Sequence, residues 1–196
     1  MTAASHITRR AGLAGAAAVL ALAGCASAAT GEEAMSEDRD LAAHAHDWDW
    51  LEGAWNVRHR RLKGRLVGST EWEAFDGWCE MRKTMGGFGN VDDNVVEIPS
   101  GAYRAMGVRA FNRETRQWSI WWLDERYPAT IEPPVRGGFV DGVGEFTGDD
   151  TLNGQPIKVR FRWTDTRTTS PRWEQAFSAD GGQTWEVNWE MQFRRA

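Results

Sequence analysis

Few residues of this 196-residue chain have types and spacings that suggest catalysis. Asp124 and Glu125 follow a tryptophan-rich stretch, and Glu80 and Arg82 alternate along another. His59 is expected to share a strand face with aromatic side chains. A carboxylate in an apolar pocket has a raised pKa and can act as an acid or base, but ion pairs or solvated strand faces explain these residues at least as well. No nucleophile–base spacing or phosphate-binding loop accompanies them. The sequence therefore leaves open whether the protein is an enzyme and indicates no catalytic residue.

The histidines give no convincing ligand set. His44 and His46 stand two residues apart beside Asp47, without further ligands nearby in the sequence, so no metal is expected. Barrels of the nitrobindin type hold haem through a histidine late in the chain, whereas all four histidines here lie at or before His59. We therefore expect no metal and no cofactor.

One short motif suggests sugar chemistry. In the stretch SADGGQTWEVNW, residues 178–189, the order S-x-D-x-G-x-T-W resembles the Asp-box of sialidases and other β-propellers. Propellers carry several such boxes and a 20–50-residue repeat, but this chain has one box and no repeat. The motif therefore predicts a tight Asp-Gly-Gly hairpin turn before the last strand.

The N-terminus has the pattern of an export signal. Arg9 and Arg10 precede 14 uncharged residues, 11–24, which are too few to span a bilayer but typical of a signal-peptide core. The following LAGC closely resembles the bacterial lipobox, which implies that Cys25 is lipidated and anchors the protein to a membrane. Ala26, in place of Asp, implies by analogy with the bacterial sorting rule the periplasmic face of the outer membrane.

Composition divides the rest of the chain. Residues 25–40 are small, polar and acidic, which predicts a flexible tether, and residues 41–196 are expected to form one domain. Cys79 is then the single remaining thiol, so no internal disulfide is expected and burial would keep it inert. The net charge of −5 excludes the phosphate-dominated contacts of a nucleic-acid-binding protein.

Alternating apolar and polar residues recur through this domain and indicate β-strands. Turn sequences rich in Gly, Asn and Asp separate them. The pattern predicts an all-β fold: a single antiparallel up-and-down β-barrel of about 8–10 strands with a short N-terminal helical turn, or alternatively a sandwich. The expected strands are 54–62, 68–76, 78–85, 102–111, 118–124, 136–140, 143–148, 157–163, 172–178 and 185–194.

The opening Gly53-Ala54-Trp55 resembles the Gly-x-Trp motif of lipocalins and other calycins. That resemblance implies that a basic residue of the last strand, Arg195 or alternatively Arg194, packs over Trp55 and closes a calycin-like barrel. The chain is more similar still to an uncharacterised bacterial family that opens with D-W-D-W-L-x-G-x-W and ends with D-G-G-x-T-W and R-R. This second resemblance implies the barrel fold and no established activity.

The 12 tryptophans lead to the functional prediction. Eight strands enclose just enough space for side chains or one small ligand, and more strands enclose more. We expect the protein to bind a small apolar or aromatic molecule at the cell envelope. The alternatives are a barrel enzyme of isomerase, hydratase or lyase type, and a structural lipoprotein with a filled core. The expected lining residues are Trp55, Trp72, Trp118, Trp122, Trp163, Trp173 and Trp189.

Overall fold

The computed structural model describes residues 35–196. The predicted signal peptide and the lipid-attachment residue Cys25 lie outside the described residues. Within them, residues 35–43 are helical, although residues up to 40 were expected to belong to a flexible tether. No helix in this described part is long and apolar enough to cross a bilayer.

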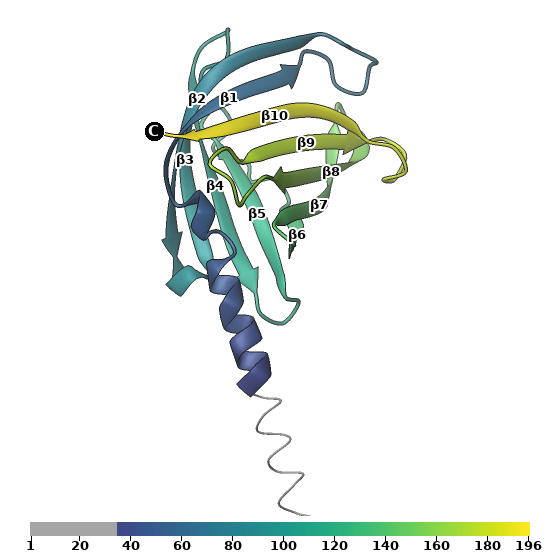
Figure 1. Cartoon of the computed structure of the whole chain (residues 1–196). Helices are drawn as coiled ribbons and strands as arrows, with labels where there is room; N and C mark the ends of the chain where they lie inside the picture. The colour runs from purple at the N-terminus through teal and green to yellow at the C-terminus, as the bar shows by residue number, and fades with distance from the viewer. Residues whose placement is uncertain (1–34) are drawn as a thin grey trace, which may run out of the picture. The chain divides into compact units, whose positions relative to one another are not determined.

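The predicted all-β barrel is confirmed, because ten antiparallel strands form one closed sheet (Figure 1). Each strand pairs with the next along the chain, and β10 returns to pair with β1. The strands are β1 (Gly53–Leu62), β2 (Trp72–Thr84), β3 (Gly89–Val96), β4 (Tyr103–Asn112), β5 (Gln117–Asp124), β6 (Val135–Val140), β7 (Val143–Leu152), β8 (Gln155–Thr164), β9 (Arg172–Ser178) and β10 (Glu186–Arg195).

The barrel wall is paired unevenly. The closing pair β1–β10 runs from Trp55 opposite Arg195 to Arg61 opposite Trp189. The β5–β6 pair has only three partnered positions, which end at Ile120 opposite Val135. Beyond Ile120, β5 continues to Asp124 while the chain runs through residues 125–134 before β6 begins. The wall is therefore shortest between β5 and β6.

The segment before β1 fills one end of the barrel. Two short 3-10 turns, η1 (His44–His46) and η2 (Asp49–Leu51), carry Trp48 and Leu51 into the core, where they are 1% and 0% exposed. The Trp48 ring lies within 4.8–6.0 Å of five aromatic rings, those of Trp50, Trp118, Phe139, Phe146 and Trp163. This end is solid because aromatic edges and faces interlock there.

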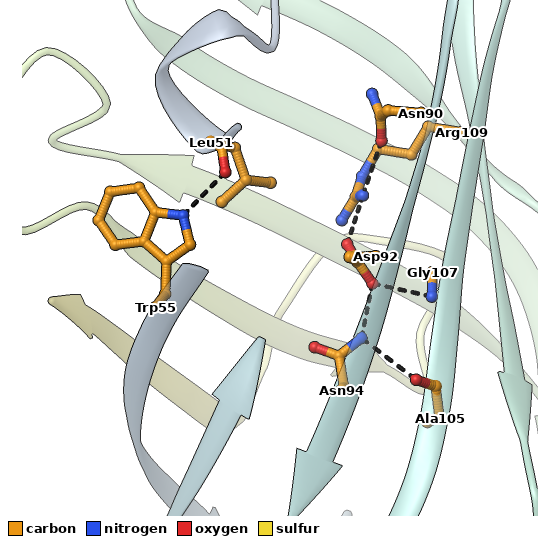
Figure 2. Close-up of polar contacts among 8 residues, drawn as sticks. All are labelled: Leu51, Trp55, Asn90, Asp92, Asn94, Ala105, Gly107 and Arg109. Carbon is orange, nitrogen blue, oxygen red and sulfur yellow. Dashed lines mark hydrogen bonds and ion pairs between the residues drawn. The ribbon is translucent and has the colours of Figure 1, made fainter. Parts of the chain in front are cut away.

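Arg195 closes the barrel at the same end. Its guanidinium lies 3.8 Å from the ring centroid of Trp55 and donates hydrogen bonds to the backbone carbonyls of Glu52 and Trp50. The Trp55 indole in turn donates to the carbonyl of Leu51 at 2.8 Å, as Figure 2 shows. Arg194, the alternative candidate, lies opposite Asn56 in the strand pairing, whereas Arg195 lies opposite Trp55. The structure thus places Arg195 over Trp55, as the calycin resemblance implied.

The largest predicted number of strands, ten, equals the observed number only because two errors in the prediction cancel. Residues 68–76 and 78–85 were expected to be separate strands, but Trp72–Thr84 is one strand that continues through Asp76 and Gly77. Strand β3 was not predicted, because GNVDDNVV carries too many polar residues for a strand with one apolar face. Its polar residues Asn90 and Asp92 are nevertheless buried.

A β-bulge interrupts the last strand. The pairing of β10 with β9 shifts between Val187 and Trp189, so Asn188 is the extra residue. The side chains of Trp185 and Val187 therefore lie on the opposite face of the sheet from that of Trp189. The Trp185 ring packs instead under the guanidinium of Arg160, 4.7 Å away, on the outer face of the barrel at β8.

The Asp-box-like motif forms the loop between β9 and β10. Asp180 accepts hydrogen bonds from the hydroxyls of Ser178 and Thr184 and from the backbone N–H of Gln183 and Thr184, at 2.6–3.0 Å. These donors, led by Thr184, hold the pKa of Asp180 well below its usual range. Gly181 and Gly182 have positive φ values of 75° and 98°, which turn the chain.

Gly77 allows His59 to fit inside the barrel, and this gives a stability prediction. A Cβ atom at Gly77 would lie 2.6 Å from both His59 Nε2 and the carbonyl oxygen of Val95. We expect Gly77→Ala to lower the free energy of unfolding by about 1–3 kcal/mol, because one contact is with rigid backbone. Gly138→Ala is the matched strand control, since no atom lies within 4 Å of its Cβ position. Urea denaturation measures both, and equal stability of the two variants would contradict this account of Gly77.

Candidate functional site

An internal cavity of about 170 Å³ lies beyond the solid end of the barrel. At about 30 Å³ per molecule in the liquid, it has room for roughly six water molecules. Three of its lining residues, Glu132, Pro133 and Asp149, are exposed, and they mark where it meets solvent beside the short β5–β6 pairing. The other lining residues are Leu51, Cys79, Asp92, Asn94, Gly107, Arg109, Ile120, Trp122, Val135, Asp150, Val159, Phe161, Trp163, Trp173, Gln175, Trp189, Met191 and Phe193.

The structure brings four of the seven predicted lining tryptophans to this cavity: Trp122, Trp163, Trp173 and Trp189. The Trp173 ring meets those of Trp163 and Trp189 at 6.5 and 5.9 Å. The cavity wall on the β8–β10 side is therefore a continuous aromatic surface.

The other three predicted lining tryptophans lie elsewhere. Trp55 and Trp118 are packed into the solid end, 2% and 0% exposed. Trp72 lies 4.7 Å under the guanidinium of Arg60. The prediction failed there because Phe75, Cys79 and Met81 are the buried positions of β2, so Trp72 has the opposite phase and faces outward.

A polar network crosses the opposite wall, on β3 and β4 (Figure 2). Arg109 donates to Asp92 at 2.5 Å and to the side-chain oxygen of Asn90 at 2.9 Å. The other Asp92 oxygen accepts from the backbone N–H of Gly107 at 2.8 Å and from the amide of Asn94 at 2.6 Å. Both carboxylate oxygens are thus supplied with donors, which a buried ion pair needs to offset its desolvation.

The network reaches the aromatic core through Arg109. Its guanidinium carbon lies 4.6 Å from the ring centroid of Trp48, a cation–π contact with the residue that fills the end of the barrel. Arg109 and Asp92 are 6% and 3% exposed. The cavity therefore has an aromatic side and a polar side, and both sides contact Trp48 at the filled end of the barrel.

Sequence reasoning missed Asn90, Asp92, Asn94 and Arg109. The signal was present in the sequence, because Asn90, Asp92 and Asn94 occupy every second position and Val95 and Val96 end the strand. Our strand prediction relied on alternating apolar residues, however, whereas this strand places its polar residues on the inner face of the barrel.

His59 stands behind the cavity wall. The Trp189 indole N–H donates to His59 Nδ1 at 3.2 Å, which places the imidazole proton on Nε2, and the ring stacks on Phe75 at 4.9 Å. Burial, and then the nearby charge of Arg61, lower the pKa of His59 to about 4. The neutral imidazole is thus an acceptor that fixes the orientation of Trp189.

The residues first considered for acid–base chemistry do not meet at this cavity. Glu80, Arg82 and Glu125 are exposed. Asp124 pairs with Arg126 at 2.5 Å, and this hydrogen bond lowers the pKa of Asp124. Among residues 35–196, no group of three or more potential metal ligands is present.

Cys79 lines the cavity as a free, buried thiol. Burial raises its pKa well above the usual range, with a further contribution from the charge of Asp92. A thiol that resists ionisation is a poor nucleophile, so Cys79 contributes apolar surface.

These features define the class: a closed β-barrel with an internal cavity. No family model and no curated protein matches the chain. Among solved structures, Rv2717c from M. tuberculosis is similar, with 12% sequence identity, a TM-score of 0.50, and coverage of 78% of this chain and 97% of that chain. At this identity the similarity shows the fold alone.

The low pKa of His59 makes stability depend on pH. As pH falls below about 6.5, the unfolded chain takes up the proton first, so folding stability decreases until about pH 4, where the native state also binds it. The difference between the pKa values of His59 in the unfolded and the folded protein corresponds to about 3 kcal/mol of folding stability. We expect His59→Gln to lose less stability between pH 7 and 4 than the wild type does. Denaturation at fixed pH values measures this, and parallel curves for the two proteins would contradict it.

Proposed function

We propose that this protein is an exported, lipid-anchored barrel that binds a small apolar or aromatic molecule inside its cavity. The single observation that carries the proposal is the roughly 170 Å³ cavity lined by four tryptophans. Small-molecule sites are typically concave, mostly apolar and preformed, with a few polar groups that fix orientation. Export and anchoring to the outer membrane at Cys25 are supported by the sequence alone, through the uncharged residues 11–24, the lipobox-like LAGC and Ala26.

The cavity offers a molecule two kinds of surface. Ring faces of Trp122, Trp173 and Trp189 provide apolar area, whose burial contributes about 25 cal/mol per Å². The opposite wall is held rigid by the Asp92–Arg109 network. Because the rigid wall and the packed rings exist before binding, little ordering free energy opposes association.

An enzyme is the second candidate, because polar side chains do converge on the cavity: Asp92, Asn94, Arg109 and Gln175. Binding is favoured over turnover because both Asp92 oxygens already accept hydrogen bonds from protein donors. A structural lipoprotein with a filled core is the least favoured, since the cavity leaves the interior partly open.

Filling the cavity tests the binding function. Val159 lines it and is 5% exposed, whereas Val140 is 75% exposed on β6. We expect bromobenzene, a heavy-atom quencher, to reduce tryptophan fluorescence saturably in the wild type and in Val140→Phe. The affinity of Val159→Phe should be at least about tenfold weaker, because the larger ring occupies the space.

Near-ultraviolet circular dichroism establishes that Val159→Phe is folded. Linear, non-saturating quenching in the wild type would refute an internal site. A small molecule released unchanged when the natively purified protein is denatured supports binding. Conversion of that molecule to a new mass by the folded protein would favour the enzyme.

A further inference from the structure

The side chain of Gln175 presents an unused hydrogen-bond acceptor to the cavity. Gln175 is 9% exposed and alternates along β9 with the buried residues Trp173 and Phe177, so its side chain lies on the inner face of the barrel. Its strand partners Phe161 and Trp189 also line the cavity. Gln175 therefore lies in the middle of the aromatic wall.

The neighbours of Gln175 fix the orientation of its amide. The amide nitrogen donates to the side-chain oxygen of Asn188 at 2.8 Å, and the Asn188 nitrogen donates to the backbone carbonyl of Glu186 at 3.4 Å. Among residues 35–196, no donor reaches the remaining atom, Gln175 Oε1. It is not one of the unpartnered atoms that are fully buried, so a molecule in the cavity can reach it. A buried acceptor normally has a partner, and here only the contents of the cavity can supply one.

Asn94 carries a second unused amide oxygen. Its nitrogen donates to Asp92 and to the carbonyl of Ala105, as Figure 2 shows. Asn94 is less buried than Gln175, so water reaches its oxygen more readily. Gln175 is therefore the acceptor that gains most from a donor on a bound molecule.

Asp150 places a carboxylate without a cationic partner on the inner face. It follows Phe146 and Gly148 at every second position of β7 and pairs with the buried Ile157. Within the described part of the chain, no lysine, arginine or histidine forms an ion pair with Asp150 or with Glu132, the exposed carboxylate where the cavity meets solvent. Two negative charges at the mouth of the cavity are therefore uncompensated.

The other charges of the lining are balanced. Arg109 pairs with Asp92, and Asp149 pairs with Lys158, each at 2.5 Å. The Cys79 thiol stays neutral because burial raises its pKa. The uncompensated charge of the cavity is thus negative, and it favours a cation over an anion.

The indole rings act in the same direction, because a cation is attracted to the face of a tryptophan ring. Trp122 and Trp173 both line the cavity. These indoles and Arg109 are also hydrogen-bond donors, so hydrogen bonding alone does not select the sign of the charge on a ligand. The unpaired carboxylates and the ring faces do.

Asp150 and Gln175 are too far apart to contact one ligand group. They pair with Ile157 and Phe161 of the strand between them, β8, and these two positions are four residues, about 13 Å, apart along the strand. A molecule that contacts both residues must be polar at two ends and apolar between them.

From this arrangement we propose that the cavity binds a small aromatic amine in its protonated form. The ammonium group lies at Asp150, the ring packs against the tryptophans, and a hydrogen-bond donor at the far end of the ring binds Gln175 Oε1. A cavity of about 150 Å³ holds benzene, so about 170 Å³ with an open mouth accommodates one ring with a short side chain. This specificity rests on the proposed binding function and names the chemical class of its ligand.

Four compounds of matched shape separate charge from hydrogen bonding. Propylbenzene has neither group, phenethylamine has the cation, 4-propylphenol has the donor and tyramine has both. We expect calorimetry at neutral pH to show phenethylamine binding about 3–10-fold more tightly than propylbenzene, because Asp150 and the indoles stabilise its charge. Tyramine should bind about 5–10-fold more tightly than phenethylamine, the effect of one buried hydrogen bond. A fifth compound, the anion 3-phenylpropionate, should bind most weakly.

Matched variants locate the two contacts. Asp150→Asn removes the charge and keeps the shape, so the preference for phenethylamine over propylbenzene should shrink. Glu145→Gln removes a charge from the outer face of the same strand, so the preference should persist. Gln175→Met should remove only the gain of tyramine over phenethylamine. In ¹⁵N-labelled wild type, the Gln175 side-chain amide resonance should shift more with tyramine than with phenethylamine, which keeps the test valid if this variant does not fold.

The outcomes separate the two levels of the proposal. Equal binding of phenethylamine and propylbenzene, or tightest binding of 3-phenylpropionate, would overturn the preference for a cation and leave the binding function standing. Equal binding of tyramine and phenethylamine would mean that water satisfies Gln175, which overturns the second contact. An equal loss of preference in Asp150→Asn and Glu145→Gln would overturn the role of Asp150. Failure of all five compounds to bind would overturn the binding function as well.

Discussion

The cavity depends on one buried ion pair, Arg109 with Asp92. A charged pair inside a barrel is stable only when its remaining polar groups are satisfied, and here Asn90, Asn94 and the Gly107 backbone provide most of that satisfaction. The pair holds β3 against β4 and presents the guanidinium to the Trp48 ring. The ion pair thus joins the barrel wall to the N-terminal segment that fills one end of the barrel. It also forms part of the polar wall of the cavity.

The two ends of the barrel differ because aromatic residues are distributed unevenly. At one end Trp48, Trp118, Phe139 and Phe146 interlock, and Arg195 over Trp55 closes the seam. Toward the other end the β5–β6 pairing stops after three positions, and the space inside is not filled. Ten strands enclose more volume than side chains readily fill. The N-terminal segment fills part of the excess, and the cavity is the part left over.

Alternation and turn residues were sufficient to predict an antiparallel barrel and its approximate strand number, and the calycin resemblance implied the closure of Trp55 by a basic residue. These patterns could not predict β3, because its inward-facing residues are Asn90, Asp92 and Asn94. In the sequence, polar residues that face inward cannot be told from polar residues that face solvent. Gly77 was taken as a turn residue although it serves to admit His59. The bulge at Asn188 reversed the phase of Trp185 without any local sequence signal. The aromatic half of the site was therefore predictable in part, and the polar half was not, because its burial is set by partners distant in the sequence.

We propose that the barrel interior admits a small molecule between an aromatic wall and a polar one. The most direct measurement is anomalous diffraction from crystals soaked in bromobenzene, which locates bromine independently of any affinity assay. The account predicts a bromine peak inside the cavity, among Trp122, Trp173 and Trp189. Bromine peaks confined to the outer surface, with the cavity side chains collapsed inward, would contradict it.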